Sequence, residues 1–203
     1  MKYALINGNL LDGNIDMQVK RGYTILINDN KIEKVSKEKL SLDGYKVIDL
    51  KGEYVMPGLI NLHVHLPSSG RPKRKPTDPV KLVKLLTSNA LFRRIVLAVC
   101  ESLAKTELLS GVTTIRTVGG VMDVDTKIRD RVKAKKVVGP RILASNMAIS
   151  VPGGHMADSL AYACRDEEEA RECVRKIASE AAMCMCLPAP PRAPQTFCSA
   201  AIR

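Results

Sequence analysis

From residue 57 onward the sequence alternates between short apolar runs and longer amphipathic stretches, and this alternation limits the folds open to the chain. The β-branched apolar runs predict strands, and stretches with an apolar residue every three or four positions predict helices. The predicted strands are 59–66, 112–118 and 141–149, and the predicted helices are 80–109, 123–136 and 166–182. Strands that alternate with helices in this way favour an α/β fold with a parallel sheet.

The first 56 residues have a different pattern, with short strands joined by tight turns. Asn7-Gly8 and Asn28-Asp29-Asn30 separate β-branched runs, and such turn residues are hairpin signals. The predicted strands are 3–6, 23–27, 31–35 and 46–50. We therefore expect a small antiparallel β unit, in which we find no residues that suggest chemistry.

Two of the three histidines stand close together at the end of the run 59–66, which follows Pro57-Gly58. Side chains of a strand alternate between its faces, so His63 and His65 are expected to point the same way. Two neighbouring imidazoles form half of a chelating site for a divalent metal. A single strand histidine is more often a core or surface residue than a ligand, so the pair needs further support.

That support comes from the third histidine. His155 stands in Gly153-Gly154-His155, shortly after the third predicted strand. Ligands of parallel α/β sheets bind at the carboxyl ends of the strands. The pattern therefore predicts that all three histidines meet at one edge of one sheet. This favours a metal site over the alternative that they are ordinary core or surface residues.

Composition excludes several other classes of protein. The net charge of +11 would suit an anionic partner, but most basic residues are mixed with acids, and the one dense cluster, 71–75, has no aromatic neighbours to stack bases. We therefore expect no nucleic-acid partner. No apolar run approaches the roughly 20 residues of a membrane span, and the N-terminus has no signal-peptide pattern. The six cysteines lack disulfide spacing, and Cys184-x-Cys186 has no second pair to complete a metal site, so we expect reduced thiols in the cytoplasm.

Three motifs carry a resemblance to a known family. They are VMPGLINLHVH at 55–65, LSGVTTIR at 109–116, and GPRILAS at 139–145 leading to Gly153-Gly154-His155. On these motifs, residues 1–182 resemble the N-terminal part of the metal-dependent amidohydrolase superfamily. The similarity is to its imidazolonepropionase-like and Xaa-Pro-dipeptidase-like members.

The resemblance implies a fold and an activity. It implies that residues 57–182 form about three βα units of a (β/α)8 TIM-like barrel, and that residues 1–56 form part of a small antiparallel β-sandwich. Such enzymes hold one or two divalent metals, usually zinc, and hydrolyse C–N bonds of amide type in small molecules or dipeptides through a metal-activated water. By residue matching, His63 and His65 are expected to be metal ligands and His155 a substrate-binding residue. Assembly into a homo-oligomer stays open.

The basic cluster has two readings in such a barrel. Residues 71–75 follow the first barrel strand, so the loop would lie over the catalytic face. There it would either attract an acidic substrate or form an ordinary solvated loop, and the second reading is the more common one.

The chain also departs from the family pattern. A complete site needs a lysine or acid on strand 4, histidines on strands 5 and 6, and an aspartate on strand 8, and no residue here can be assigned to these roles. No histidine follows His155, and the segment 183–203 is rich in proline and cysteine. We expect this segment to be disordered or frame-shifted. The alternative to an active hydrolase is therefore a truncated, inactive fragment, and we assign no catalytic residue.

Overall fold

The computed structural model describes residues 1–70 and 78–180. It divides the chain into two compact units, the first being Met1–Gly58 and the second beginning at Leu59. The basic cluster 71–75 and the segment 183–203 lie outside the described residues. Among the described helices, none combines the length and apolar character that a membrane crossing requires.

The first unit is one five-stranded sheet with the order β3-β2-β1-β4, and β5 also pairs with β1. The pairs β1–β2 and β2–β3 are antiparallel, as the turn signals predict, but β4 and β5 run parallel to β1. The expectation of an antiparallel unit is therefore wrong for these two strands. The connection 37–45 returns the chain to the end of the sheet where β1 begins, so that Lys46 pairs with Tyr3. The strands are β1 (Lys2–Leu10), β2 (Lys20–Asn28), β3 (Lys31–Ser36), β4 (Lys46–Asp49) and β5 (Tyr54–Val55).

Asn7-Gly8 is not a hairpin turn, contrary to the sequence-based expectation. Both residues lie inside β1, where the pairing with β2 shifts register between Leu5 and Gly8. Asn7 adopts a left-handed conformation with φ of 55°, which asparagine tolerates better than most residues. A Cβ atom at Gly8 would stand 2.6 Å from Cδ1 of Leu50, so the small residue also allows close packing. The same two residues that favour a hairpin therefore form a β-bulge here.

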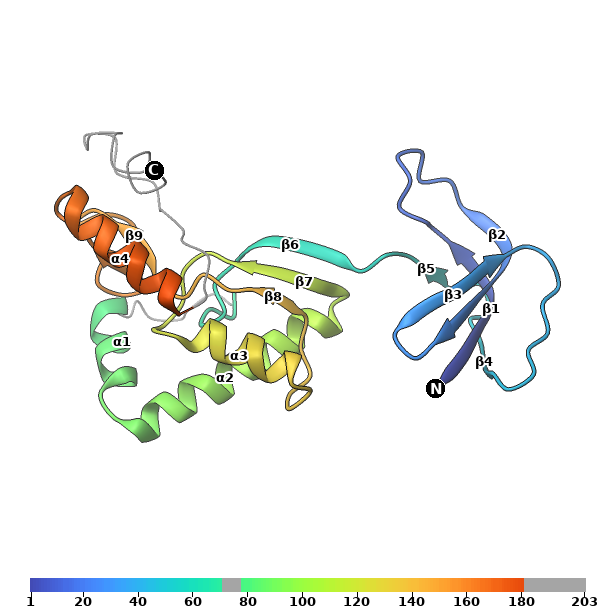
Figure 1. Ribbon diagram of the computed structural model, residues 1–203, viewed down its shortest axis with the longest axis horizontal. Helices are drawn as coiled ribbons and strands as arrows, with labels where there is room; N and C mark the ends of the chain where they lie inside the picture. The colour runs from blue at the N-terminus through green and yellow to red at the C-terminus, as the bar shows by residue number, and fades with distance from the viewer. Residues whose placement is uncertain (71–77, 181–203) are drawn as a thin grey trace. The chain divides into compact units, whose positions relative to one another are not determined.

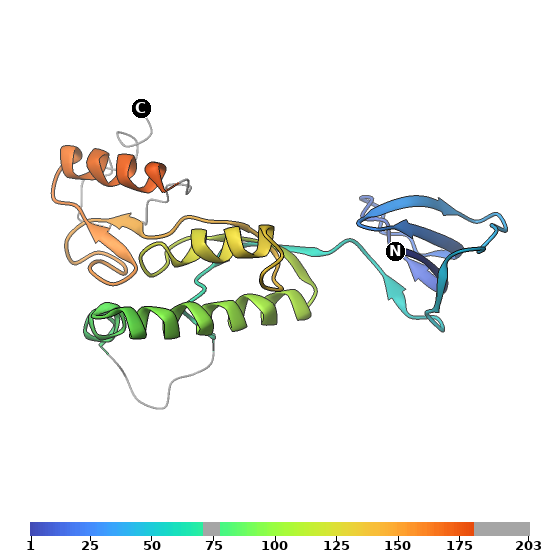
Figure 2. The same cartoon turned by 60° about the horizontal axis from the view of Figure 1, so that its bottom comes forward.

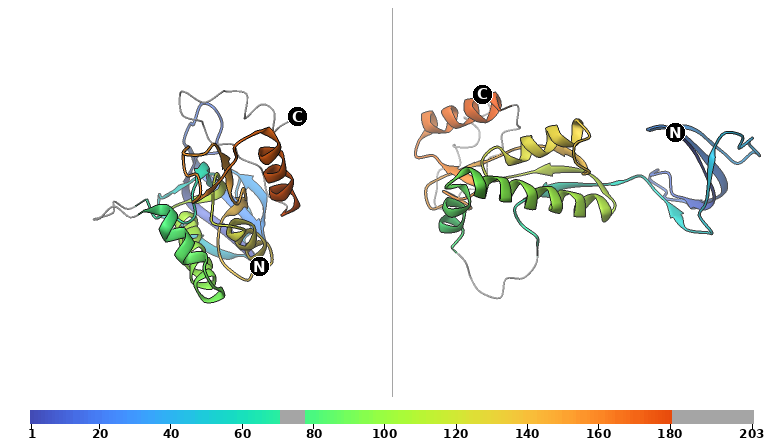
Figure 3. Two further views of the ribbon diagram at one scale, coloured as in Figure 1. Left: turned by 90° about the vertical axis from the view of Figure 1, so that its left-hand side faces the viewer. Right: turned by 90° about the horizontal axis from the view of Figure 1, so that it is seen from below.

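The second unit is built on a three-stranded parallel sheet with the order β6-β7-β8 (Figure 1). Its strands are β6 (Leu59–Val64), β7 (Val112–Thr117) and β8 (Arg141–Leu143), and the helices between them are α1 (Pro79–Thr87), α2 (Ala90–Leu109) and α3 (Val124–Lys133). Helices α2 and α3 lie side by side along the strands (Figure 3, right). The predicted alternation of strands and helices is confirmed, and the unit is of the α/β class.

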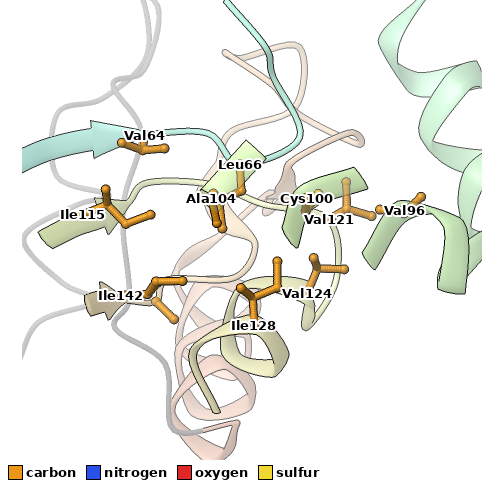
Figure 4. Packing of buried hydrophobic residues seen from close by; sticks show 11 residues of the cluster. Val64, Leu66, Val96, Cys100, Ala104, Ile115, Val121, Val124, Ile128 and Ile142 are labelled. Carbon is orange, nitrogen blue, oxygen red and sulfur yellow. The ribbon is translucent and has the colours of Figure 1, made fainter. Parts of the chain in front are cut away.

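A single apolar core joins this sheet to its helices (Figure 4). Each strand contributes one central side chain, namely Val64, Ile115 or Ile142. These pack against side chains from one face of each helix: Val96, Cys100 and Ala104 of α2, and Val124 and Ile128 of α3. Burying each of the large aliphatic side chains contributes about 1.5–3 kcal/mol relative to exposure. The core therefore holds the carboxyl ends of β6 and β7 next to each other.

The stretch 80–109 has continuous helical periodicity but forms two helices. The chain turns sharply between α1 and α2 (Figure 2), at Ser88 and Asn89. Asn89 is the N-cap of α2, and its Oδ1 accepts a hydrogen bond of 3.0 Å from the backbone N–H of Phe92. Asparagine favours this position because its side chain satisfies an N–H group that has no partner within the helix. A capping residue thus divides a stretch that periodicity alone predicts as one helix.

The predicted strand 141–149 is wrong in extent. Only β8 joins the parallel sheet, whereas β9 (Ala148–Ser150) pairs with β10 (Ala161–Ala163) in a separate two-stranded sheet. Residues 144–147 separate β8 from β9, and among them Asn146 adopts a left-handed conformation with φ of 56° that breaks the predicted run. The last helix, α4 (Glu167–Ser179), packs on this second sheet through Ile177 and Ala170, which contact Ile149.

The cap at Asn89 makes a testable prediction about stability. Replacing Asn89 by alanine removes the acceptor for the Phe92 amide, so the free energy of unfolding should fall by about 1 kcal/mol. Asn89→Asp keeps an acceptor at the same position and should stay within a few tenths of a kcal/mol of the parent. Urea unfolding monitored by circular dichroism measures both variants. Equal stability of Asn89→Ala and the parent would contradict the role of this cap.

Candidate functional site

The histidine pair lies at the carboxyl end of β6. The ring centroids of His63 and His65 are 5.3 Å apart, and the ring planes meet at 80°. His63 is exposed and His65 is half-buried. The pairing of β6 with β7 shifts register between Asn61 and Val64, so the strand is irregular just where the histidines leave it. Such irregularities re-aim side chains at sheet ends, and the sequence did not reveal this one.

The backbone of a neighbouring turn determines the tautomer of His65. Nδ1 of His65 lies 3.0 Å from the carbonyl oxygen of Gly119, which follows β7. A carbonyl oxygen can only accept a hydrogen bond, so Nδ1 carries the proton. In the neutral imidazole, Nε2 then keeps its lone pair and is available to a metal ion. Histidines that bind a metal through one ring nitrogen ordinarily donate a hydrogen bond from the other, and the contact with Gly119 provides that bond for His65.

Glycine at position 119 allows the backbone to approach this closely. Gly119 has φ of +139°, a conformation that other residues rarely adopt. A Cβ atom there would stand 3.5 Å from both Nδ1 and Cε1 of the His65 ring. Glycine is therefore required at position 119 mainly by the backbone conformation, since a Cβ atom there would make only ordinary contacts with the His65 ring.

A cavity of about 260 Å³ adjoins the histidine pair. It lies between the end of β6 and the second half of α2, which contributes Leu103, Thr106 and Glu107. His63 and His65 both line it, together with Ser68 and Ser69 of the following loop. In the described parts of the chain, no group of three or more His, Cys, Asp or Glu side chains is placed to hold a metal ion. The described site therefore holds two imidazoles beside an open space.

His155 does not lie at the edge of the sheet that carries the other two histidines, contrary to the prediction from the sequence. It is exposed on the loop between β9 and β10, and β9 is not part of the sheet that carries His63 and His65. His155 is not among the residues that line the cavity beside the pair. Its role in substrate binding stays a prediction.

A buried carboxyl group lies behind the Gly119-Gly120 turn. Asp125, in the first turn of α3, has no exposed surface, and its two oxygens have no well-formed hydrogen bond among the described residues. Burial raises the pKa of Asp125 from 3.8 to about 6, against smaller opposing effects of the Thr117 hydroxyl and the Asn146 backbone. A Cβ atom at Gly120 would stand 2.6 Å from Oδ1 of Asp125. The carboxyl group therefore packs directly against the turn.

Asn146 ties the same turn to β8 and α3. Its carbonyl oxygen accepts a hydrogen bond of 2.6 Å from the Gly120 N–H, and its Oδ1 accepts one of 3.0 Å from the Thr126 N–H. Its Nδ2 donates to Oε2 of Glu180 at 2.8 Å. Asn146, which follows β8, thus fixes the Gly119-Gly120 turn and is itself fixed by the hydrogen bond from Thr126 of α3.

Sequence reasoning missed Asp125, although a signal was present. On a helical projection, Asp125 shares a stripe with Val121, Ile128 and Val132, at spacings of three and four residues. An acid on the apolar stripe of a helix is expected to be buried.

Comparison with known proteins decides the family. The family model described as "Amidohydrolase family" matches residues 54–194. The chain belongs to the amidohydrolase family. This family generally uses divalent metals, and the His63–His65 pair, with Nε2 of His65 available, is of the right chemistry for such an ion. The expected superfamily is therefore confirmed.

Individual relatives of the chain support the same conclusion. The chain is 40% identical to a dihydroorotase from Syntrophotalea carbinolica over 70 residues, which are 34% of this chain and 16% of that protein. Among solved structures, a proposed prolidase from Bifidobacterium longum is 32% identical with a TM-score of 0.69, and an amidohydrolase is 28% identical with a TM-score of 0.72. The chain matches over 89% and 90% of its own length but covers only 39% and 45% of these two structures.

The buried carboxyl of Asp125 predicts a pH dependence of stability. The folded-state pKa of about 6 exceeds the ordinary value of 3.8, so the folded chain holds a proton that the unfolded chain has released. The contribution of Asp125 to the free energy of unfolding should therefore fall as pH rises from about 4 to 6. Above pH 6 this contribution should stay lower than its value at pH 4, by up to roughly 2–3 kcal/mol. Asp125→Asn, which cannot ionise, should lose this fall.

Denaturant unfolding of parent and variant between pH 4 and 8 measures the difference. Asp130→Asn on the same helix is a matched control, because Arg129 lowers the pKa of the exposed Asp130 carboxyl. Asp130→Asn should change the pH dependence of the free energy of unfolding only slightly, and in the direction opposite to that of Asp125→Asn. If the pH profile of Asp125→Asn runs parallel to that of the parent, the buried carboxyl is not titrating in this range.

Proposed function

We propose that this chain carries the first βα units of a (β/α)8 hydrolase barrel. Among residues 59–70 and 78–180, the core of the three parallel strands is formed with helices on one face, whereas a parallel sheet is ordinarily covered on both faces or closed into a barrel. Leu59, Ile60 and Leu62 of β6 are each at least half exposed here, and a closed barrel would cover such side chains. The likeness to two longer amidohydrolase structures supports this reading. Residues 57–182 are then barrel and residues 1–56 a separate β unit.

His63 and His65 would hold a divalent metal ion, zinc in this proposal. The observation that supports this most strongly is the contact between His65 Nδ1 and the Gly119 carbonyl, which leaves Nε2 as an acceptor. The bound ion would supply an activated water for attack on a carbonyl carbon. The chain itself positions both imidazoles through the end of β6, and the Gly119 carbonyl orients that of His65. Additional ligands and the general base are not assigned among the described residues.

The proposed reaction is hydrolysis of a C–N bond of amide type in a small molecule or dipeptide. His155 would contact the substrate, since its loop follows a strand end in the same unit. The names of the relatives, which include a dihydroorotase and a proposed prolidase, support hydrolysis and leave the substrate open. The alternative of a truncated, inactive fragment rests on the later metal ligands and the aspartate base that remain unassigned, and no observation on the described residues favours it over the hydrolase.

The metal site is tested by measuring zinc binding to the 203-residue chain by isothermal titration calorimetry. His63→Ala and His65→Ala should each weaken zinc affinity by at least about 10-fold, because each removes one of two imidazole ligands. His155→Ala is the matched control and should leave zinc affinity unchanged. Equal affinity of all three variants and the parent would overturn the assignment of the ligands.

The activity is tested with a panel of Xaa-Pro dipeptides and N-acyl amino acids. The proposal predicts turnover that a chelator removes, that zinc restores, and that His63→Ala abolishes. His155→Ala should raise KM more than it lowers kcat if the residue only binds substrate. Turnover that survives both the chelator and His63→Ala would contradict a metal-dependent reaction.

A further inference from the structure

Two cysteine thiols contact each other away from the histidine pair. Sγ of Cys164 and Sγ of Cys173 are 3.5 Å apart. Cys164 follows β10 and is buried, whereas Cys173 lies on α4 and is half-buried. A disulfide needs about 2.05 Å between the sulfurs, so the two atoms would approach by about 1.5 Å. Small side-chain rotations supply a movement of this size.

The fold holds both residues in place. The backbone N–H of Cys164 donates a hydrogen bond of 2.8 Å to the Ser150 carbonyl at the end of β9. Helix α4 is capped by Asp166, whose Oδ1 accepts from the Glu169 N–H at 2.9 Å. Both cysteines belong to the apolar cluster between α4 and the second sheet, with Ile149, Ala170 and Ile177. The contact between the sulfurs is therefore a product of the packing of α4 against the residue that directly follows β10.

A small oxidant can reach the pair. A cavity of about 410 Å³ is lined by both cysteines, and three of its other lining residues are the acids Asp158, Glu169 and Glu172. These carboxylates disfavour an anionic oxidant such as oxidised glutathione, and they leave a neutral one such as hydrogen peroxide unaffected. Cys173 is the more exposed thiol and is expected to react first.

We propose that Cys164 and Cys173 are a dithiol modification site that a peroxide converts to a disulfide. The Cys173 thiolate attacks one oxygen of hydrogen peroxide, the O–O bond breaks, and a sulfenic acid and water result. The Cys164 thiolate then attacks the sulfenic sulfur, the S–S bond forms and a second water leaves. Two thiols and one peroxide thus give one disulfide and two waters. The site is independent of the proposed hydrolase activity.

Cys100 supplies an internal comparison. It is buried in the core of the parallel sheet, and burial raises the pKa of its thiol to about 12. It therefore has almost no thiolate at neutral pH and should stay reduced under the same treatment.

The experiment is peptide mapping of the full chain after mild treatment with hydrogen peroxide, alkylation under denaturing conditions and trypsin digestion. The expected product is peptide 142–165 joined to peptide 172–175, two hydrogens lighter than the sum of the two, and lost on reduction. Peptide 95–105, which holds Cys100, should be recovered in its alkylated form. Recovery of Cys164 and Cys173 as separate alkylated peptides would overturn the proposal. So would a bridge from either one to a cysteine in 181–203.

Thermal unfolding tests whether the bridge forms within the folded structure. The crosslink joins β10 to α4, so oxidation should raise the melting temperature of the parent by about 5 °C, and reduction should reverse the change. Cys173→Ser keeps a residue of similar size but cannot form the bridge, and its melting temperature should not respond to peroxide. A decrease in the parent, or an equal increase in Cys173→Ser, would show that the disulfide does not fit the native packing.

Discussion

The packing of α2 and α3 against one face of the parallel sheet is the interaction on which the second unit depends. Val64, Ile115 and Ile142, one from each strand, meet the two helices in a continuous core. Every segment of the candidate site leaves the sheet directly beyond this core. His65 follows Val64 by one residue, and Gly119 follows β7 by two. The positions of the site residues are therefore consequences of how the core packs.

The site itself is assembled by close approach of backbone segments. The Gly119 carbonyl contacts the imidazole of His65, and on its other side the turn packs against the carboxyl of Asp125. A buried carboxyl group is unfavourable at neutral pH, since ionisation in an apolar surrounding costs free energy. We interpret the buried Asp125 carboxyl as a feature that lowers the stability of the fold at neutral pH while it supports the Gly119-Gly120 turn. Departures from ordinary packing rules are common near functional sites.

Much of the second unit is predictable from local pattern, and the failures have identifiable causes. Strand β7 and helices α3 and α4 follow hydrophobic periodicity because each buries one face, and β6 follows from its apolar run. Periodicity cannot show that Asn89 caps a helix or that Asn146 ends a strand, because these residues act through single hydrogen bonds and one backbone conformation. The parallel pairing of β4 with β1 was missed because turn residues describe only neighbouring strands. In the site, alternation predicts two adjacent imidazoles, but nothing local predicts the supporting Gly119 carbonyl.

By itself, the sequence determined the class of the chain, its membership in the amidohydrolase family and the proximity of His63 to His65, because these depend on motifs and on periodicity within one segment. Only the tertiary structure decided which nitrogen of His65 carries the proton, that Asp125 is buried, and that Cys164 contacts Cys173. Each of these involves residues from different elements. Such distances are set when helices pack on sheets, and a linear pattern contains no record of them.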